Sequence, residues 1–184
     1  MGLGNPGPEY ENTRHNAGFR LVDRLVQRWQ IGPFRQVDRA REARGHWKEF
    51  EVAVVKPQTY MNRSGSVLAS LRDTPAFDPS QHLLIVVDDV ALPLGRFRLR
   101  GAGSAGGHNG LKSVEGALQR QDYPRLRIGV GPAPPDLDTL ADYVLDEFTP
   151  DERDALEKLL DPMSEAVECW LENGTEQAMN QFNR

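Results

Sequence analysis

Apolar residues recur with helical spacing in several stretches of the chain. The clearest stretch is residues 16–30, where apolar positions fall three or four residues apart and mark one face of a helix. Similar spacing predicts shorter helices over residues 64–71 and 109–118. Two or three further helices are expected to finish the chain, beginning at Leu137, Pro150 and Gly174.

Short apolar runs between these helices are typical of strands. The most strongly marked is residues 83–87, and weaker runs lie at residues 52–55 and 126–130. Residues 96–100 alternate arginine with apolar side chains, which predicts a strand with one solvated, cationic face. Residues 1–4 have the character of the end of a strand, and the prolines and glycine that follow predict a turn.

Strands separated by helices favour an α/β fold. We expect a three-layer single domain over residues 1–184, with a central mixed, mostly parallel twisted sheet flanked by helices. A chain of 184 residues buries about 70% of the surface that its unfolded form exposes, so it needs no disulfide or structural metal to fold. Residues 34–45 are polar and rich in arginine, and their pattern predicts no element.

Composition narrows the class of protein further. Hydrophobic residues make up 39% of the chain, and no apolar run approaches the roughly 18 residues that a membrane-spanning helix needs. The chain opens on a turn rich in glycine and proline, so we expect no signal peptide. The single Cys169 excludes an internal disulfide and a cysteine-based zinc site. These features predict a soluble protein of the reducing cytosol.

The net charge of −5 conceals an uneven distribution along the chain. Residues 1–135 carry 19 cationic and 13 acidic side chains, whereas residues 136–176 carry 2 cationic and 14 acidic ones. A basic body beside an acidic segment can attract a polyanion to one face and repel it from another. Arginine supplies 18 of the 22 cations, which suits phosphate binding but is also the result of base composition in some genomes.

Two glycine patterns suggest nucleotide binding only weakly. Both residues 2–7 and residues 101–106 match the G-x-G-x-x-G pattern. Prolines keep a helix from beginning beneath the first, and the second lacks the downstream acid of a dinucleotide site. The second still leads into a predicted helix, where Asn109 is either the N-cap or a donor aimed into a cleft.

Polar residues that follow predicted strands form a candidate hydrolytic centre. His15 lies just before the first helix, Asp88 ends the strand at residues 83–87, and Asn5 follows residues 1–4. Ligands of open α/β sheets bind at the carboxyl ends of strands, so these side chains can meet in one crevice together with Asn62. A histidine held by a carboxylate beside amide donors is a general base with oxyanion stabilisation. No serine or cysteine occupies a nucleophile elbow, so the base would activate water directly.

A metal is the competing explanation for a histidine beside carboxylates. His46 and His82 lie in unrelated segments, and no pair of histidines has metal-ligand spacing. Asp88 and Asp89 could hold Mg²⁺, but neighbouring residues of a strand point to opposite faces. The pattern therefore favours water and histidine over a metal.

Arginines on the predicted strands suggest a surface for phosphate. Arg96, Arg98 and Arg100 alternate along one strand face, and Arg125 and Arg127 share a face of another. The other interpretation of such a pattern is a solvated sheet edge that is protected by charge. Without a known RNA-binding motif, we expect contact with phosphates and no base-specific recognition.

Several runs of residues carry a family pattern in a fixed order. They are GLGNPG at 2–7 with Tyr10, TRHNAG at 13–18, KPQTYMNRSG at 56–65, DDVALPLG at 88–95, GSAGGHNGLK at 103–112 and RLRIGVG at 125–131. Together they resemble the signature of bacterial-type peptidyl-tRNA hydrolases over nearly the whole chain. The resemblance implies an α/β enzyme that cleaves the ester between a peptide and the 3′ ribose of tRNA. It also implies a cytoplasmic monomer that needs no metal or cofactor.

The resemblance also assigns roles to individual residues. It makes His15 the catalytic base, Asp88 the carboxylate that orients it, and Asn5 the amide that positions the reacting centre. Positions that hold the peptide backbone and the tRNA 3′ CCA end, or line the cleft, are Tyr10, Tyr60, Met61, Asn62, His108 and Asn109. Arg100 and Arg127 match basic positions that contact the acceptor backbone or the 5′ phosphate. Peptidyl-tRNA is thus the only partner that the resemblance implies.

The chain departs from the family pattern at two places. Ala91 stands where the family has a second acid after the Asp88–Asp89 pair, and the first strand is short. We expect both departures to affect stability more than chemistry. Three other hypotheses stay open at this point: a tRNA-binding module without activity, a nucleotide-dependent oxidoreductase, and a hydrolase of another ester or amide.

Overall fold

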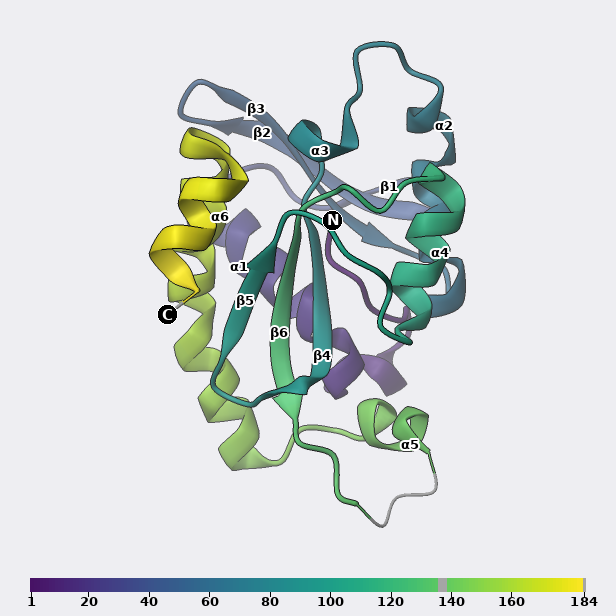
Figure 1. The fold of residues 1–184 in the computed structure, drawn as a ribbon, viewed down its shortest axis with the longest axis vertical. Coiled ribbons are helices and arrows are strands. Elements are labelled where there is room, and N and C mark those ends of the chain that lie inside the picture. Colours follow the sequence, from purple (N-terminus) through teal and green to yellow (C-terminus); the bar gives the residue numbers. More distant parts are fainter. Residues whose placement is uncertain (136–138, 184) are drawn as a thin grey trace.

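The computed structural model describes residues 1–135 and 139–183 (Figure 1). The α-helices are α1 (Ala17–Trp29), α2 (Ala69–Arg72), α3 (Pro79–His82), α4 (Asn109–Leu118), α5 (Leu140–Leu145) and α6 (Pro150–Phe182). The strands are β1 (Arg35–Val37), β2 (Ala40–Trp47), β3 (Phe50–Pro57), β4 (Ile85–Pro93), β5 (Phe97–Arg100) and β6 (Arg125–Gly131). Three 3₁₀ helices complete the described elements: η1 (Pro8–Tyr10), η2 (Arg14–Asn16) and η3 (Met61–Leu68).

Two groups of three strands meet at the N-terminal segment. The strands β1, β2 and β3 form an antiparallel meander, whereas β6 lies between β4, to which it is parallel, and β5, to which it is antiparallel. Gly2 donates a backbone hydrogen bond to Val55 of β3, and Leu3 donates one to Val86 of β4. The N-terminal segment therefore joins the two groups.

The expectation of an α/β fold with a mixed sheet is confirmed, but the expectation that the sheet is mostly parallel is wrong. Among the named strands, only β4 and β6 pair in parallel, and a single parallel bridge joins Gly2 to Val86. The reason lies in residues 34–57, because the polar stretch without a clear pattern forms β1 and much of β2. A short turn joins β1 to β2 in an antiparallel pair, and hydrophobic periodicity gives little signal for such strands on a solvated edge.

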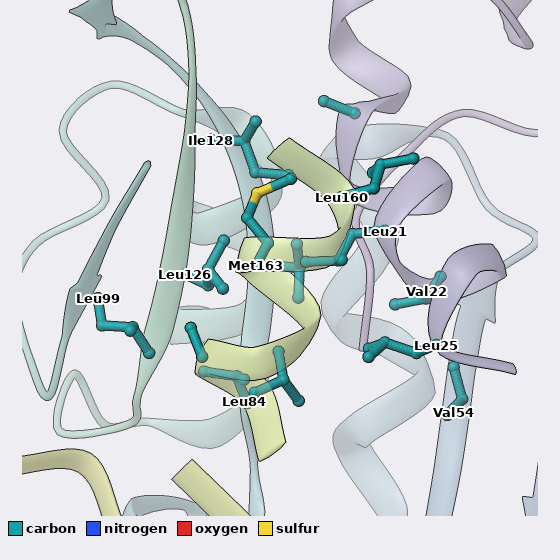
Figure 2. Packing of buried hydrophobic residues seen from close by; sticks show 14 of the residues in the cluster. Leu21, Val22, Leu25, Val54, Leu84, Leu99, Leu126, Ile128, Leu160 and Met163 are labelled. Atoms are coloured by element: carbon teal, nitrogen blue, oxygen red, sulfur yellow. The ribbon is translucent and has the colours of Figure 1, made fainter. Parts of the chain in front are cut away.

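Helices cover both faces of the sheet, as a three-layer arrangement requires. On one face α1 and α6 pack against alternate strand residues, among them Val86, Leu126 and Ile128. Figure 2 shows Met163 of α6 and Leu21 of α1 in this cluster. On the other face Ile85 and Val87 of β4 pack with residues of η3 and α4. The alternation of residues along β4 thus places successive side chains in different hydrophobic clusters.

Most of the predicted elements are present with shifted ends. Residues 16–30 form α1, residues 109–118 form α4, and helical geometry in α6 begins at Pro150 and is interrupted at Gly174. The helix expected over 64–71 is instead η3 followed by α2, and it begins earlier, at Met61. The helix start expected at Leu137 lies outside the described residues. No helix in the described part of the chain is long and apolar enough to cross a membrane.

The acidic segment near the C-terminus is used inside the fold. Arg24 of α1 forms ion pairs with Glu157 and Asp161 of α6, and Arg28 pairs with Glu168. The basic and acidic parts of the chain therefore neutralise each other along the α1–α6 interface. This pairing compensates part of the acidic charge of α6, because charges at such close range compensate each other locally.

Candidate functional site

Two neighbouring parallel segments bring the candidate residues together, although β4 continues to Pro93 and so does not end before Asp88 as expected. Asn5 follows the N-terminal segment that pairs with β4, and Asp88 lies within β4 itself. His15 belongs to η2, which leads directly into α1. A Cβ atom at Gly18 of α1 would fall 2.5 Å from the Leu3 carbonyl oxygen, so only glycine allows α1 to approach the sheet this closely. This close approach holds η2, and with it His15, beside β4.

His15 and Asp88 form a buried hydrogen-bonded pair. The Nδ1 atom of His15 lies 3.0 Å from both carboxylate oxygens of Asp88, and both residues are buried. An ionised carboxylate only accepts hydrogen bonds, so Nδ1 carries the proton and donates it. The lone pair of the neutral ring is then on Nε2, which has no protein partner among the described residues. This tautomer is the one that a general base at Nε2 requires.

His108 is a second histidine on the same carboxylate. Its Nδ1 accepts hydrogen bonds from the backbone N–H groups of Gly110 and Leu111, at 3.1 and 3.3 Å. The proton of the neutral ring is therefore on Nε2, which donates to Asp88 at 3.0 Å. His108 is thus the N-cap of α4, and the interpretation of Asn109 as the cap is wrong. Asn109 is the first residue of the helix and lines the cleft.

The two histidines keep Asp88 ionised. Burial by itself raises the pKa of Asp88, but the charges of His15 and His108 and their hydrogen bonds lower that pKa well below its ordinary value. The carboxylate is therefore an acceptor throughout the physiological pH range. It stabilises positive charge on His15 when that ring takes up a proton.

The same three side chains are the only described group of histidine, cysteine and carboxylate ligands with the proximity a metal needs. Their ligand atoms lie within 4.8 Å of one another. The nitrogens that face Asp88, however, are the protonated ones in the hydrogen-bonded arrangement above. His108 in addition gives its other nitrogen to two backbone N–H groups. An ion at this position would have to displace both protons, because a ligating imidazole nitrogen needs a free lone pair.

Asn5 is held in place by three hydrogen bonds. Asn16 accepts from the backbone N–H of Asn5 at 2.8 Å and donates to its carbonyl oxygen at 3.0 Å. The side-chain oxygen of Asn5 accepts from the backbone N–H of Met61 at 2.7 Å. The side-chain NH₂ group of Asn5 is therefore the part that remains to act on a ligand.

A cleft of about 680 Å³ opens above this cluster. Each of the eleven site residues expected from the sequence lines it: Asn5, Tyr10, His15, Tyr60, Met61, Asn62, Asp88, Arg100, His108, Asn109 and Arg127. The glycine-rich loop before α4 and one side of α5 complete its wall. Leu140 and Leu145 of α5 belong to that wall and are exposed, at 58% and 41% of their surface.

Aromatic residues stand at the rim of the cleft. Tyr10 and Tyr60 meet edge to face, with ring centroids 6.4 Å apart. The Tyr60 side chain is 60% exposed. Such a ring offers a face on which a nucleobase or an apolar side chain can stack.

The arginines of β5 and β6 have different surroundings from those that their sequence pattern predicts. Arg100 is exposed, and Arg127 forms an ion pair with Asp89. Arg125 does not share a solvated face with Arg127, because its side chain is buried over the Tyr123 ring and bonds to two backbone carbonyls. Of the three arginines from these strands that line the cleft, Arg100 has no ion-pair partner among the described residues, Arg127 is paired with Asp89, and Arg125 is buried.

Two residues that support the site carry no assigned role in the sequence analysis. Asn16 holds Asn5, as described. Arg14 is buried, donates to the Tyr143 carbonyl and pairs with Glu152 at 2.7 Å, which ties η2 to α5 and α6. Both lie beside His15 in the run TRHNAG, so their position next to the candidate base is the signal that could have identified them.

Comparison with known proteins agrees with this geometry. The family model described as peptidyl-tRNA hydrolase matches residues 1–184. The peptidyl-tRNA hydrolase of Gemmatimonas aurantiaca is 46% identical over 186 residues, with 100% of this chain and 98% of the relative covered. That of Chloroflexus aggregans is 46% identical over 183 residues, with coverage of 100% and 97%. A crystal structure of peptidyl-tRNA hydrolase from Acinetobacter baumannii superposes with a TM-score of 0.90 at 33% identity, covering 99% of this chain and 92% of that one. With the match extending over the whole chain, this protein belongs to the peptidyl-tRNA hydrolase family.

Proposed function

We propose that this protein hydrolyses the ester between a nascent peptide and the 3′ ribose of peptidyl-tRNA, with water activated by His15. The observation that carries the proposal is the His15–Asp88 pair at the base of a cleft that the expected substrate-binding residues line. The family match supports the choice of substrate. Release of tRNA and peptide would recycle tRNA from abortive translation in the cytoplasm.

The reaction follows from the tautomer of His15. Its Nε2 removes a proton from water, and the water oxygen attacks the ester carbonyl carbon. Asp88 stabilises the imidazolium that forms. The tetrahedral intermediate then collapses, the bond to the ribose oxygen breaks, and the same nitrogen returns the proton to that oxygen. General-base catalysis of this kind contributes about 10²–10⁴-fold.

Amide side chains supply the remaining interactions. The NH₂ group of Asn5 is oriented by the hydrogen bond to Met61 and is available to the carbonyl oxygen as negative charge develops there. Asn62 and Asn109 offer donors and acceptors that suit a peptide backbone of any sequence. A free aminoacyl group lacks the acylated nitrogen, so it would lose these contacts and be rejected.

The rim of the cleft is the proposed region for tRNA. Tyr10 and Tyr60 offer ring surfaces near the 3′ end, and Arg100 and Arg127 are the proposed contacts to the acceptor backbone. The expectations that residues 1–184 form one domain, and that it acts as a monomer without a cofactor, stay predictions.

Hydrolysis of N-acetyl-aminoacyl-tRNA tests the proposal, with aminoacyl-tRNA as the negative substrate and EDTA present throughout. We expect the wild type to cleave only the acylated substrate, and His15→Ala to lower kcat by about 10²–10⁴-fold. His46→Ala is the matched control, because His46 is exposed on β2. Failure of the wild type to cleave would refute the substrate, and full activity of a folded His15→Ala variant would refute the role of His15.

A further inference from the structure

A second hollow adjoins the cleft and shares Asn62 with it. It has a volume of about 520 Å³ and lies where the turn between β1 and β2 meets η3 and α4. Its walls are formed by Arg39, Thr59, Asn62, Arg63, Ser66 and Ser113. Asn62 lines this hollow and the cleft alike, so the two spaces meet at that residue.

The two arginines of the hollow are not neutralised. Arg39 and Arg63 are exposed, and no carboxylate of the described residues lies within 4.0 Å of either guanidinium. Arg127, on the opposite side of the cleft, is paired with Asp89. Two guanidinium groups that face one space repel each other, and an anion between them removes that repulsion.

The remaining walls offer hydrogen-bond donors. The hydroxyl groups of Thr59 and Ser66 are buried and have no hydrogen-bond partner among the described residues. The Ser113 hydroxyl oxygen accepts from the backbone N–H of Gly65 at 2.9 Å, which leaves its own hydrogen to be donated. A hollow lined by two arginines and four residues with neutral polar side chains, without a carboxylate, suits a group that has several acceptor oxygens and a negative charge.

We propose that this hollow binds a backbone phosphate of the single-stranded 3′ end of the tRNA. The inference rests on the proposed function, which places the 3′-terminal ribose ester beside His15. The nucleotide chain must leave the cleft from that point, and Asn62 lines both the cleft and the hollow. In the sequence, Tyr60 lies between Thr59 of the hollow and Met61 of the cleft. Its ring is exposed, so a base can stack on it.

Such a site would raise affinity for the tRNA end and would also favour substrates that carry phosphodiesters. Phosphate contacts fix the register of a strand without reading its sequence, which suits an end that all tRNAs share. An acylated nucleoside without phosphates would enter the cleft but gain nothing from the hollow. The difference between substrates with and without phosphodiesters therefore isolates its contribution.

The test measures KM for two substrates with the wild type, with Arg63→Ala and with the double variant Arg39→Ala/Arg63→Ala. One substrate is an N-acetyl-aminoacyl CCA trinucleotide without a 5′ phosphate, and the other is N-acetyl-aminoacyl adenosine. We expect KM for the trinucleotide to rise about 10-fold in the single variant and further in the double variant, with kcat retained. KM for the adenosine substrate is expected to stay at the wild-type value.

Controls separate charge from folding and phosphate from other anions. Arg63→Lys is expected to restore part of the affinity, and Arg44→Ala is expected to change nothing, because Arg44 pairs with Glu42 on β2. Inorganic phosphate is expected to compete only weakly. The slope of log KM against log salt for the trinucleotide should become shallower by about 0.7 per lost phosphate contact.

Direct binding separates this inference from the proposed function. Fluorescence anisotropy of an unacylated CCA trinucleotide reports on the hollow even if no substrate is cleaved. Weaker binding by Arg63→Ala than by Arg44→Ala would support the site whatever the activity. Equal binding by the two variants, or an equal rise in KM for the adenosine substrate, would overturn it.

Discussion

Asp88 and Arg100 both line the cleft, but their surroundings differ in kind. Asp88 is 3% exposed and accepts hydrogen bonds from two histidines whose own positions are held by helix ends. Arg100 extends from a strand into solvent. A buried group with several fixed partners has one geometry, whereas an exposed arginine keeps rotamer freedom and a screened charge.

Because of this difference, we expect the interior of the cleft to control kcat and its rim to control KM. The interior of the cleft positions a water molecule and a carbonyl, so small displacements there act on the chemical step. The rim attracts a polyanion, so substitutions there act on KM and depend on ionic strength. Four further substitutions test this separation.

Asp88→Asn is expected to lower kcat by about 10²–10³-fold while KM changes little. An amide presents only one acceptor oxygen to two histidine donors, so the tautomer and orientation of His15 are no longer fixed. Steady-state kinetics on N-acetyl-aminoacyl-tRNA measures the effect. A rise in KM at unchanged kcat would place Asp88 in substrate binding instead.

Asp88→Asn should also change how the free energy of unfolding depends on pH. The pKa of Asp88 is lower in the folded chain than the value of about 3.9 for a free aspartate, so its ionised form stabilises the fold. This contribution is complete above that ordinary value and is lost as the pH falls towards the lowered pKa. Urea unfolding between about pH 5 and pH 3 should therefore show a smaller decline in unfolding free energy for Asp88→Asn than for the wild type.

Asn16→Ala tests the support of Asn5. The substitution leaves the backbone N–H and carbonyl of Asn5 without their partners, and we expect kcat to fall about 10-fold and stability to fall by about 1–3 kcal/mol. Asn12→Ala is the matched control, because Arg20 is the only described residue to which the Asn12 side chain bonds. A loss of stability with wild-type kcat would show that Asn16 has a structural role only.

Arg100→Ala is expected to have the smallest effect, a rise in KM of about 3–10-fold at low salt that shrinks as the salt concentration rises. Asp89→Asn should act in the opposite direction, because it frees Arg127 from its ion pair. KM measured at several salt concentrations distinguishes the two. A salt-independent loss in kcat for Arg100→Ala would contradict the division between interior and rim.

Local sequence patterns predicted a large part of this protein. The spacing of apolar residues indicated α1 and α4, and proline and glycine marked the start and the interruption of α6. Helical periodicity, caps and turns are properties of neighbouring residues, so a single sequence carries them. The positions of Asn5 and Asp88 after predicted strands, and of His15 before the first helix, predicted that these side chains meet in one crevice. The family motifs added further expected site residues, which also line the cleft.

Contacts between distant parts of the chain were decided only by the tertiary structure. They include the second hydrogen bond to Asp88 from His108, the burial of Arg125 and the ion pairs between α1 and α6. The antiparallel meander of β1–β3 belongs with them, since its outer residues are polar and follow no apolar period. In each case the outcome depends on which side chains meet across the sheet, and the spacing of residues along the chain does not record such encounters.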